Sequence, residues 1–276
     1  MNYETAQQLS AKDFKRRTGV YKRTFKPMLH AWHTYHLSRS NAGRPPKLCR
    51  CDQLLVALQY WREYRTYFHI AGDWEVSEST VCRIVHQVET ALMNSGLFRL
   101  PGQKSLLQGF ERPDVVVMDV TETPIERPQT RQKAYYSGKK KRHTFKCQII
   151  ANRNTLEIIC LNVGPGRRHD FQISKVSGIH IHPDTESLQD SGYQGIAAYH
   201  ANSYVPLKKP QHGELTSLQR EYNRALSQER MGIEHINRSL KIFRILSERY
   251  RNRRRRYALR CNLIAAIYNY ELSLTT

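Results

Sequence analysis

The apolar pattern of this 276-residue chain changes its period once, and that change limits the possible folds more than any other feature. Before residue 99, apolar residues recur three or four positions apart, as they do in amphipathic helices. After residue 114, short runs of β-branched residues appear, which indicate strands. The stretch between them is rich in Gly, Pro and charge. We therefore predict a helical region at 1–107 and an α/β domain at 111–276.

The helical region has the layout of a helix-turn-helix. A short helix near 66–71 and a turn precede a longer helix, for which Ser77 is a suitable N-cap. In this motif the second helix enters the major groove of DNA. We predict the motif at about 52–92, with helices near 10–18 and 24–38 before it. The side chains of the second helix that suit DNA contacts are Ser79, Arg83 and Gln87.

The second region alternates strands and helices, which predicts an α/β fold with a mixed sheet. Its first strand is a continuous apolar run that is typical of a strand buried on both faces. A helix is expected to begin near Asp170, and helices dominate after residue 216. Strands are predicted at 115–118, 145–151, 156–163, 185–189 and 204–207.

A formal net charge of +20 indicates a polyanionic partner, and double-stranded DNA is the one we expect. A basic composition alone would also fit a ribosomal protein or a peripheral membrane protein. No window has the length and hydrophobicity of a membrane span, and the first twenty residues lack the apolar core of a signal peptide. The scattered cysteines fit reduced thiols, so we expect a cytoplasmic protein, associated with the nucleoid if the host is bacterial. The basic clusters predicted to hold DNA include Lys139, Lys140, Lys141, Arg142, Arg253, Arg254 and Arg255.

Acidic residues are few, and three of them occupy positions where sites are usually built. Asp119 directly follows the predicted strand 115–118, and Asp190 follows the strand 185–189. The carboxyl ends of strands in an α/β sheet are common places for active sites. Glu234 lies in a predicted helix, and Arg230 and Lys241 fall on the same stripe of that helix. An acid between two cations suits a site that meets both a metal ion and a phosphate backbone.

Several ordered stretches carry a family resemblance over most of residues 44–270. They are MDVTETPIERP, KAYYSGKKKRHTFKCQII, GPGRRHDFQI, QDSGYQG, VPLKKP and RMGIEHINRSLKIFRIL. In this order the chain resembles the DDE transposases of bacterial insertion sequences, which belong to the Harbinger-like superfamily and carry an N-terminal helix-turn-helix. A related pattern, Tyr-x2-Arg-x3-Glu-x6-Lys, matches at Arg230, Glu234 and Lys241, with Ser227 where the pattern has Tyr.

The resemblance implies an RNase H-like domain at 111–276 whose metal-binding acids are Asp119, Asp190 and Glu234. It also implies an enzyme that binds the terminal inverted repeats of its element, cleaves DNA and transfers strands. Hard divalent ions prefer carboxylate oxygens, so we expect two Mg²⁺ ions, for which Mn²⁺ can substitute. A homodimer on DNA is expected, with no membrane partner.

Two alternatives of the same ancestry stay open: a DNA-binding regulator without catalysis, and a metal-dependent nuclease that cuts without integrating. The role of one further acid is also open. Asp170 precedes a predicted helix and suits an N-cap, while its position in the motif Arg-Arg-His-Asp would also allow it to support the metal site.

Overall fold

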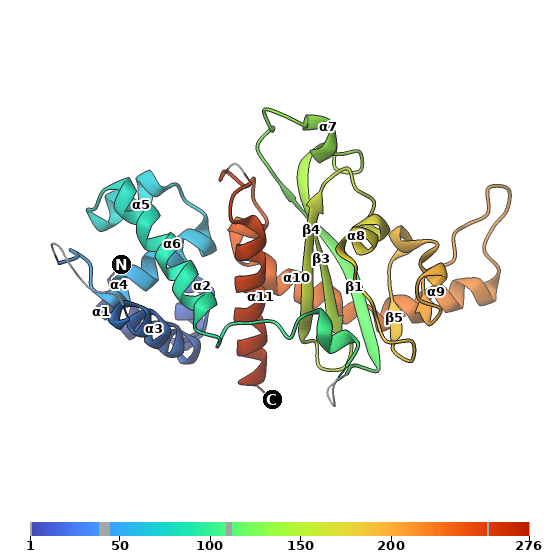
Figure 1. Cartoon of the computed structure of the whole chain (residues 1–276), viewed down its shortest axis with the longest axis horizontal. Helices are drawn as coiled ribbons and strands as arrows, with labels where there is room; N and C mark the ends of the chain where they lie inside the picture. The colour runs from blue at the N-terminus through green and yellow to red at the C-terminus, as the bar shows by residue number, and fades with distance from the viewer. Residues whose placement is uncertain (1, 39–44, 109–111, 253, 276) are drawn as a thin grey trace. The chain divides into compact units, whose positions relative to one another are not determined.

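The computed structural model describes residues 2–38, 45–108, 112–252 and 254–275, and it divides into two compact units (Figure 1). The helical unit comprises Met1–Arg99, Leu240–Glu248 and Leu263–Thr276. The sheet unit comprises Leu100–Ser239 and Arg249–Asn262. Both units therefore include segments from the C-terminal part of the chain, while the domain boundary at 107–111 stays a prediction.

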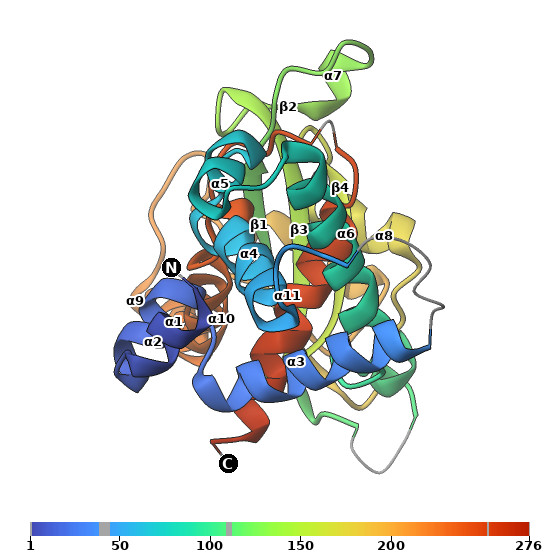
Figure 2. The same cartoon turned by 90° about the vertical axis from the view of Figure 1, so that its left-hand side faces the viewer.

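The helical unit begins with helices whose positions follow local signals in the sequence. The helices predicted near 10–18 and 24–38 are present, as is the helix-turn-helix, in which α6 packs against both α4 and α5 (Figure 2). The predicted cap is confirmed, because Ser77 Oγ accepts the Thr80 N–H at 3.3 Å. The helices of this segment are α1 (Tyr3–Gln8), α2 (Ala11–Thr18), α3 (Lys22–Leu37), α4 (Arg50–Glu63), α5 (Tyr67–Trp74) and α6 (Glu78–Asn94).

The sheet unit is built on a mixed sheet, which confirms the predicted α/β class and agrees with an RNase H-like fold. Among the described residues the sheet has six strands in the order β2-β3-β1-β5-β6, with β4 paired to β3. The β1, β3 and β4 strands are antiparallel, whereas β5 and β6 run parallel to β1. The strands are β1 (Val115–Pro124), β2 (Tyr136–Ser137), β3 (Arg142–Asn152), β4 (Ile158–Pro165), β5 (Glu186–Leu188) and β6 (Ser203–Tyr204).

The central strand β1 is longer than the sequence predicts. We expected it to end at Met118, where the apolar run stops, but it continues to Pro124. The polar residues beyond Met118 stay in the strand because each is paired with β3; Glu122, for example, lies opposite Lys146. Asp119 is therefore inside the strand and not at its end, which corrects the prediction.

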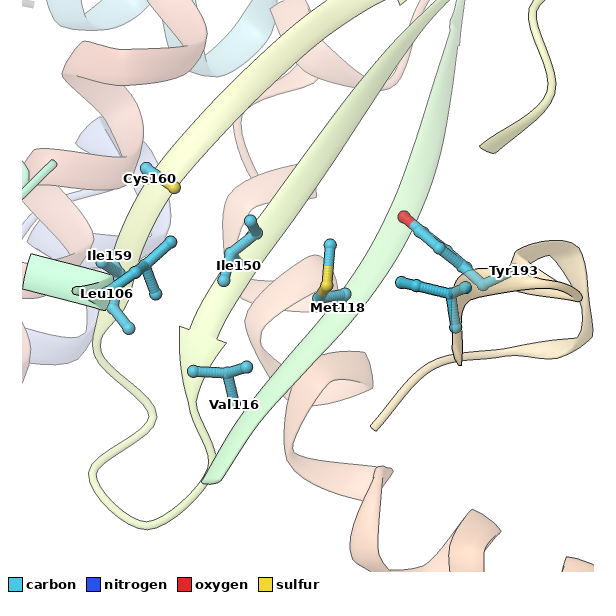
Figure 3. Close-up of a cluster of buried hydrophobic side chains, with 8 residues drawn as sticks. Leu106, Val116, Met118, Ile150, Ile159, Cys160 and Tyr193 are labelled. Atoms are coloured by element: carbon cyan, nitrogen blue, oxygen red, sulfur yellow. The ribbon is translucent and has the colours of Figure 1, made fainter. Parts of the chain in front are cut away.

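A buried apolar cluster covers one face of this sheet (Figure 3). Val116 and Met118 of β1 pack there with Ile150 of β3 and with Tyr193. Side chains alternate along a strand, so Asp119 points to the opposite face. The cluster thus holds β1, the strand that carries Asp119, in position by packing against its opposite face.

The remaining helices and 3₁₀ turns follow α6 in the chain, and η4 and most of α11 belong to the helical unit. The helix predicted near Asp170 is present, and the helix that holds Glu234 begins at Met231. No helix among the described residues is long and apolar enough to cross a membrane. The α-helices are α7 (Gln132–Tyr135), α8 (Asp170–Ser177), α9 (Ser217–Glu229), α10 (Met231–Lys241) and α11 (Tyr257–Ser273), and the 3₁₀ turns are η1 (Gln103–Leu106), η2 (Ser191–Tyr193), η3 (Ile196–Ala198) and η4 (Arg244–Leu246).

Candidate active site

Two aspartates meet where β5 ends beside β1. The parallel register pairs Val117 with Leu188, and Asp119 and Asp190 each lie two residues further along. Because β5 stops at Leu188, the sheet opens at this level, and the chain turns into η2. Asp190 begins that turn, with its Oδ1 accepting the Gly192 N–H at 2.9 Å. The register of two parallel strands thus sets the two carboxylates next to each other.

The environment of Asp119 disfavours its negative charge. Burial raises the pKa of this carboxyl above its ordinary value, and the neighbouring charge of Asp190 raises that pKa further. Arg230 opposes the rise, since its guanidinium lies 3.7 Å from Asp119 Oδ1. The side chain of Asp119 is still 24% exposed. A half-buried pair of carboxylates with incomplete compensation is a suitable place for an additional cation.

Asn237 on α10 is a further residue of the site, one that the sequence did not reveal. Its Nδ2 donates a hydrogen bond of 2.7 Å to Asp119 Oδ2. Its Oδ1 is buried and has no hydrogen-bond partner among the described residues, and the same is true of Arg230 Nε. The only signal that would have identified Asn237 is its spacing of three residues from Glu234, which places both on one face of a helix.

Glu234 occupies the expected helix, but it is exposed. Within the described ranges, no three His, Cys, Asp or Glu side chains form a group that could hold a metal ion. The structure therefore brings Asp119 and Asp190 together and does not bring Glu234 to metal-binding distance of both.

Arg230 was predicted to share one helix with Glu234 and Lys241. It is instead the C-cap residue of α9, directly before α10 begins. Two helices meet here because the backbone N–H of Arg230 bonds back to Leu226 at 3.2 Å, closing α9. The guanidinium is only 16% exposed and faces Asp119. Lys241, at the end of α10, is exposed.

Asp170 is not a helix cap, which corrects the first of its two interpretations. His169 is the N-cap residue of α8, and Asp170 is the first residue of the helix. The Asp170 carboxylate accepts a hydrogen bond of 2.8 Å from Lys146 Nζ, and Glu122 Oε1 lies 4.0 Å from the same ammonium. Lys146 belongs to the basic run of the sequence, yet it is buried. A buried lysine with two acids nearby is part of the framework of the site.

Asp170 also borders the loop that carries Asp190. A Cβ atom added at Gly192 would lie 2.7 Å from Asp170 Oδ2 and 3.0 Å from Asp190 Oδ1, so any larger residue would force a shift. Tyr193 follows and is buried, with its hydroxyl accepting a hydrogen bond of 2.6 Å from Gln148. Burial raises the pKa of Tyr193 well above its usual range, and the charges of the nearby aspartates raise it further. The packing leaves the Asp190 loop little freedom.

Two of the three predicted DNA-reading residues of the helical unit, Arg83 and Gln87, line one groove. Arg83 and Ser79 are exposed on α6, and Gln87 is half-buried one turn after Arg83. Arg83 and Gln87 border a groove of about 680 Å³, together with Lys47 and Arg50. Sequence reasoning did not single out Lys47 and Arg50, although the basic composition around them was a signal. An open groove with cations and amides at one helix face suits contact with nucleic acid.

The other predicted DNA contacts lie in two exposed segments of the sheet unit. Lys139, Lys140, Lys141 and Arg142 are exposed around the turn between β2 and β3. Arg254 and Arg255 are exposed shortly before α11, whereas Arg253 lies outside the described residues.

Two family models match the two parts of the chain. The DDE superfamily endonuclease matches residues 118–269, and the helix-turn-helix of the DDE superfamily endonuclease matches residues 46–98. A protein of Microchaete diplosiphon that is named as transposase for insertion sequence element IS702 is 50% identical over 274 residues, 99% of each chain. A protein of Streptomyces albus G that is named as transposase for insertion sequence element IS112 is 23% identical over 234 residues, 84% of each chain. The chain therefore belongs to the insertion-sequence transposases of the DDE superfamily, with a helix-turn-helix that binds DNA and a divalent-metal-dependent endonuclease domain.

Proposed function

We propose that this transposase uses Asp119, Asp190 and Glu234 to hold Mg²⁺ while it cuts and joins DNA at the ends of its own element. The observation that carries the proposal is the pair of carboxylates that each lie two residues beyond the paired residues Val117 of β1 and Leu188 of β5. Glu234 completes the set by an adjustment of α10 when DNA and metal are bound. Mn²⁺ substitutes for Mg²⁺, since both are hard ions that prefer oxygen ligands.

The donors fit such an ion on chemical grounds. Asp119 and Asp190 are carboxylates whose mutual repulsion a cation would relieve. The unpaired Asn237 Oδ1 adds a neutral oxygen beside them, as a direct ligand or through water. When bound, two divalent ions would activate the attacking oxygen and stabilise the leaving oxygen at phosphorus.

The reaction has two steps at phosphorus. In the first, water attacks a phosphodiester at the element end, the P–O3′ bond breaks, and a free 3′-hydroxyl remains. In the second, that hydroxyl attacks a target phosphodiester, so one P–O bond forms as another breaks and the target 3′-oxygen takes up a proton. No covalent bond to the protein is needed. The side chains of the site position the attacking groups and balance charge.

Other residues support this chemistry without binding the metal, by balancing charge or by holding the Asp190 loop in position. Arg230 offsets the charge of Asp119, and we propose that it turns to a DNA phosphate when a metal ion occupies the site. The buried pair of Asp170 and Lys146 steadies the Asp190 loop through the contact at Gly192. Asp170 is thus a positioning residue and not a metal ligand.

DNA recognition is assigned to the helical unit. Ser79, Arg83 and Gln87 contact the terminal inverted repeat, and the basic residues at 139–142 and 253–255, of which Arg253 lies outside the described residues, hold the DNA backbone. Lys241 adds a further phosphate contact. A transposase must hold two element ends, for which two copies of the chain are the simplest arrangement. Its place of action is the DNA of the host cytoplasm.

The experiment is the joining of a labelled element end to a target plasmid by the full-length protein with Mg²⁺. Joined product, lost in Asp190→Asn, supports the proposal. Cleavage without joining would make the protein a nuclease that does not integrate. Selective binding without cleavage would make it a regulator, and either of these results would overturn the proposal.

A further inference from the structure

The sheet unit has a hollow that Asp119, Asp190 and Glu234 do not line. It has a volume of about 600 Å³ and is formed by the segment after β1, by α7, by the β2–β3 hairpin and by the loop after β4. Three cations line it, Arg127, Lys133 and Arg167, together with Tyr136 and His143. None of the described residues that line it is acidic. This combination of cations and an aromatic ring is a feature of sites that bind single-stranded nucleic acid.

The hollow is held in shape by backbone contacts. A Cβ atom at Gly166 would lie 2.1 Å from Thr144 Oγ1 and 2.7 Å from the Tyr135 carbonyl oxygen, so only glycine fits there. The next residue, Arg167, donates its N–H to the Ala134 carbonyl at 3.1 Å. These contacts fix the loop after β4 against β3 and α7. Arg167 is therefore presented to the hollow by a tightly packed loop.

Tyr136 has the properties of a stacking platform. It is 43% exposed, although a tyrosine in a strand beside a core commonly buries its ring. It lies opposite His143 in the hairpin, and the two rings meet at 76° with centroids 5.6 Å apart. The Arg127 Nε donates to Gln132 Oε1 at 2.9 Å, which ties together two residues that line the same hollow as the ring.

We propose that this hollow binds an unpaired nucleotide, with its base stacked on Tyr136 and its flanking phosphates on Arg127, Lys133 and Arg167. A volume of about 600 Å³ lies in the range of sites for small ligands and is too small to admit a duplex. A paired base hides its faces in the helical stack, so only an unpaired base can offer one to the tyrosine. The inference rests on the proposed function, because a cut at the element end creates a strand terminus whose nucleotides can unpair and leave the stack.

The test compares single-stranded and duplex DNA on the full-length protein in EDTA. The probes are a fluorescein-labelled oligothymidylate of about 12 nucleotides, which is within the site sizes of single-strand binding proteins, and a duplex of equal length. Tyr136→Ala should weaken single-strand binding by about tenfold and duplex binding by less than about twofold. Tyr136→Phe, which keeps the ring, should bind like the wild type.

The matched control is Tyr199→Ala, since Tyr199 is also exposed and has Lys175 Nζ 4.5 Å from its ring centroid. It should change neither affinity. Arg167→Gln should lower the salt dependence of single-strand binding by about 0.7 in the log–log slope. Equal losses of affinity for both probes in Tyr136→Ala would mean that the hollow contacts the backbone of duplex DNA. No loss of affinity would mean that the Tyr136 ring does not stack on a base. Either result overturns the inference, and because no metal is present, neither depends on cleavage.

Discussion

In the helical unit, the ion pair between Arg65 and Asp73 stands at the surface, with each side chain 36% exposed. In the sheet unit, the pair between Lys146 and Asp170 is inside, with side chains 11% and 20% exposed. The first pair tightens the turn between two helices and leaves its charges in water. The second is surrounded by further acids, because Glu122 and the Asp190 loop lie beside it.

The two ion pairs illustrate two uses of charged side chains: exposed charges for contact with DNA, and clustered, largely buried charges around a metal site. A DNA-reading helix needs exposed charged side chains. Because water solvates these charges, each one adds little electrostatic free energy to the folded state. A metal site needs acids close together, which is unfavourable until a cation arrives. The sheet unit therefore carries, at Asp119 and Asp190, a repulsion between carboxylates that a bound cation would relieve.

The largest effect is expected for activity. Asp119→Asn and Asp190→Asn should each reduce cleavage by at least about 1,000-fold, equal to about 4 kcal/mol of transition-state stabilisation. Selective binding of the terminal repeat should survive, because recognition is assigned to the helical unit. Gel-based cleavage and binding assays on the same preparations measure both. Loss of selective binding together with cleavage would show that the two functions are not separate.

Breaking the buried pair should destabilise the fold. Lys146→Met leaves Asp170 and Glu122 without their cation, and removal of one partner of a buried pair costs about 3–5 kcal/mol. Arg65→Gln is the matched change in the helical unit and should cost less than about 1 kcal/mol. Urea unfolding followed by circular dichroism measures both free energies. Similar costs for the two variants would remove the contrast between the units.

Base reading should depend on one exposed arginine of α6. Arg83→Ala should reduce selection of the terminal repeat over random duplex by about 1–3 kcal/mol, if Arg83 contacts a base edge. Arg16→Ala, at an exposed position of α2, is the control and should leave the selectivity unchanged. Competition binding with the two duplexes gives the ratio directly. An equal loss of affinity for both duplexes in Arg83→Ala would assign this residue to phosphate.

The smallest effect concerns pH and stability without metal. The raised pKa of Asp119 means that the folded protein disfavours the ionised carboxylate, so its contribution to stability falls as pH rises through that raised pKa. Asp119→Asn has no charge to lose, so in EDTA it should be more stable than the wild type at neutral pH. The difference should shrink below the ordinary pKa of an aspartate. An advantage that is independent of pH would argue against this electrostatic origin.

Much of the helical unit follows from short stretches of sequence. Ser77 and Thr66 cap their helices by bonds to residues three positions ahead, and such bonds are visible in a local pattern. The sheet unit was less predictable, because its extent depends on partners far along the chain. Thr123, for example, stays in β1 with its hydroxyl bonded to Tyr257 at 2.7 Å. No local pattern indicates that contact.

The candidate active site could likewise be predicted only in part from local sequence. The sequence order identified Asp119 and Asp190, and the register of β1 and β5 explains why they meet. Lys146 looked like one more residue of a basic run, but it is buried, opposite Glu122 of β1 and bonded to Asp170 of α8. Asn237 carries no charge, so a pattern of acidic and basic residues does not include it. Residues that support a site through contacts with distant parts of the chain cannot be recognised from the sequence around them.

The central claim is that Asp119, Asp190 and Glu234 hold one divalent metal site. Binding of Mn²⁺ to the full-length protein, in the presence of uncleaved element-end DNA and followed by electron paramagnetic resonance, tests this claim most directly. The account predicts that Asp119→Asn, Asp190→Asn and Glu234→Gln each weaken Mn²⁺ binding by at least about tenfold, or about 1.4 kcal/mol. Glu221→Gln, an exposed position on α9, should bind Mn²⁺ like the wild type. Wild-type affinity in Glu234→Gln would contradict the claim.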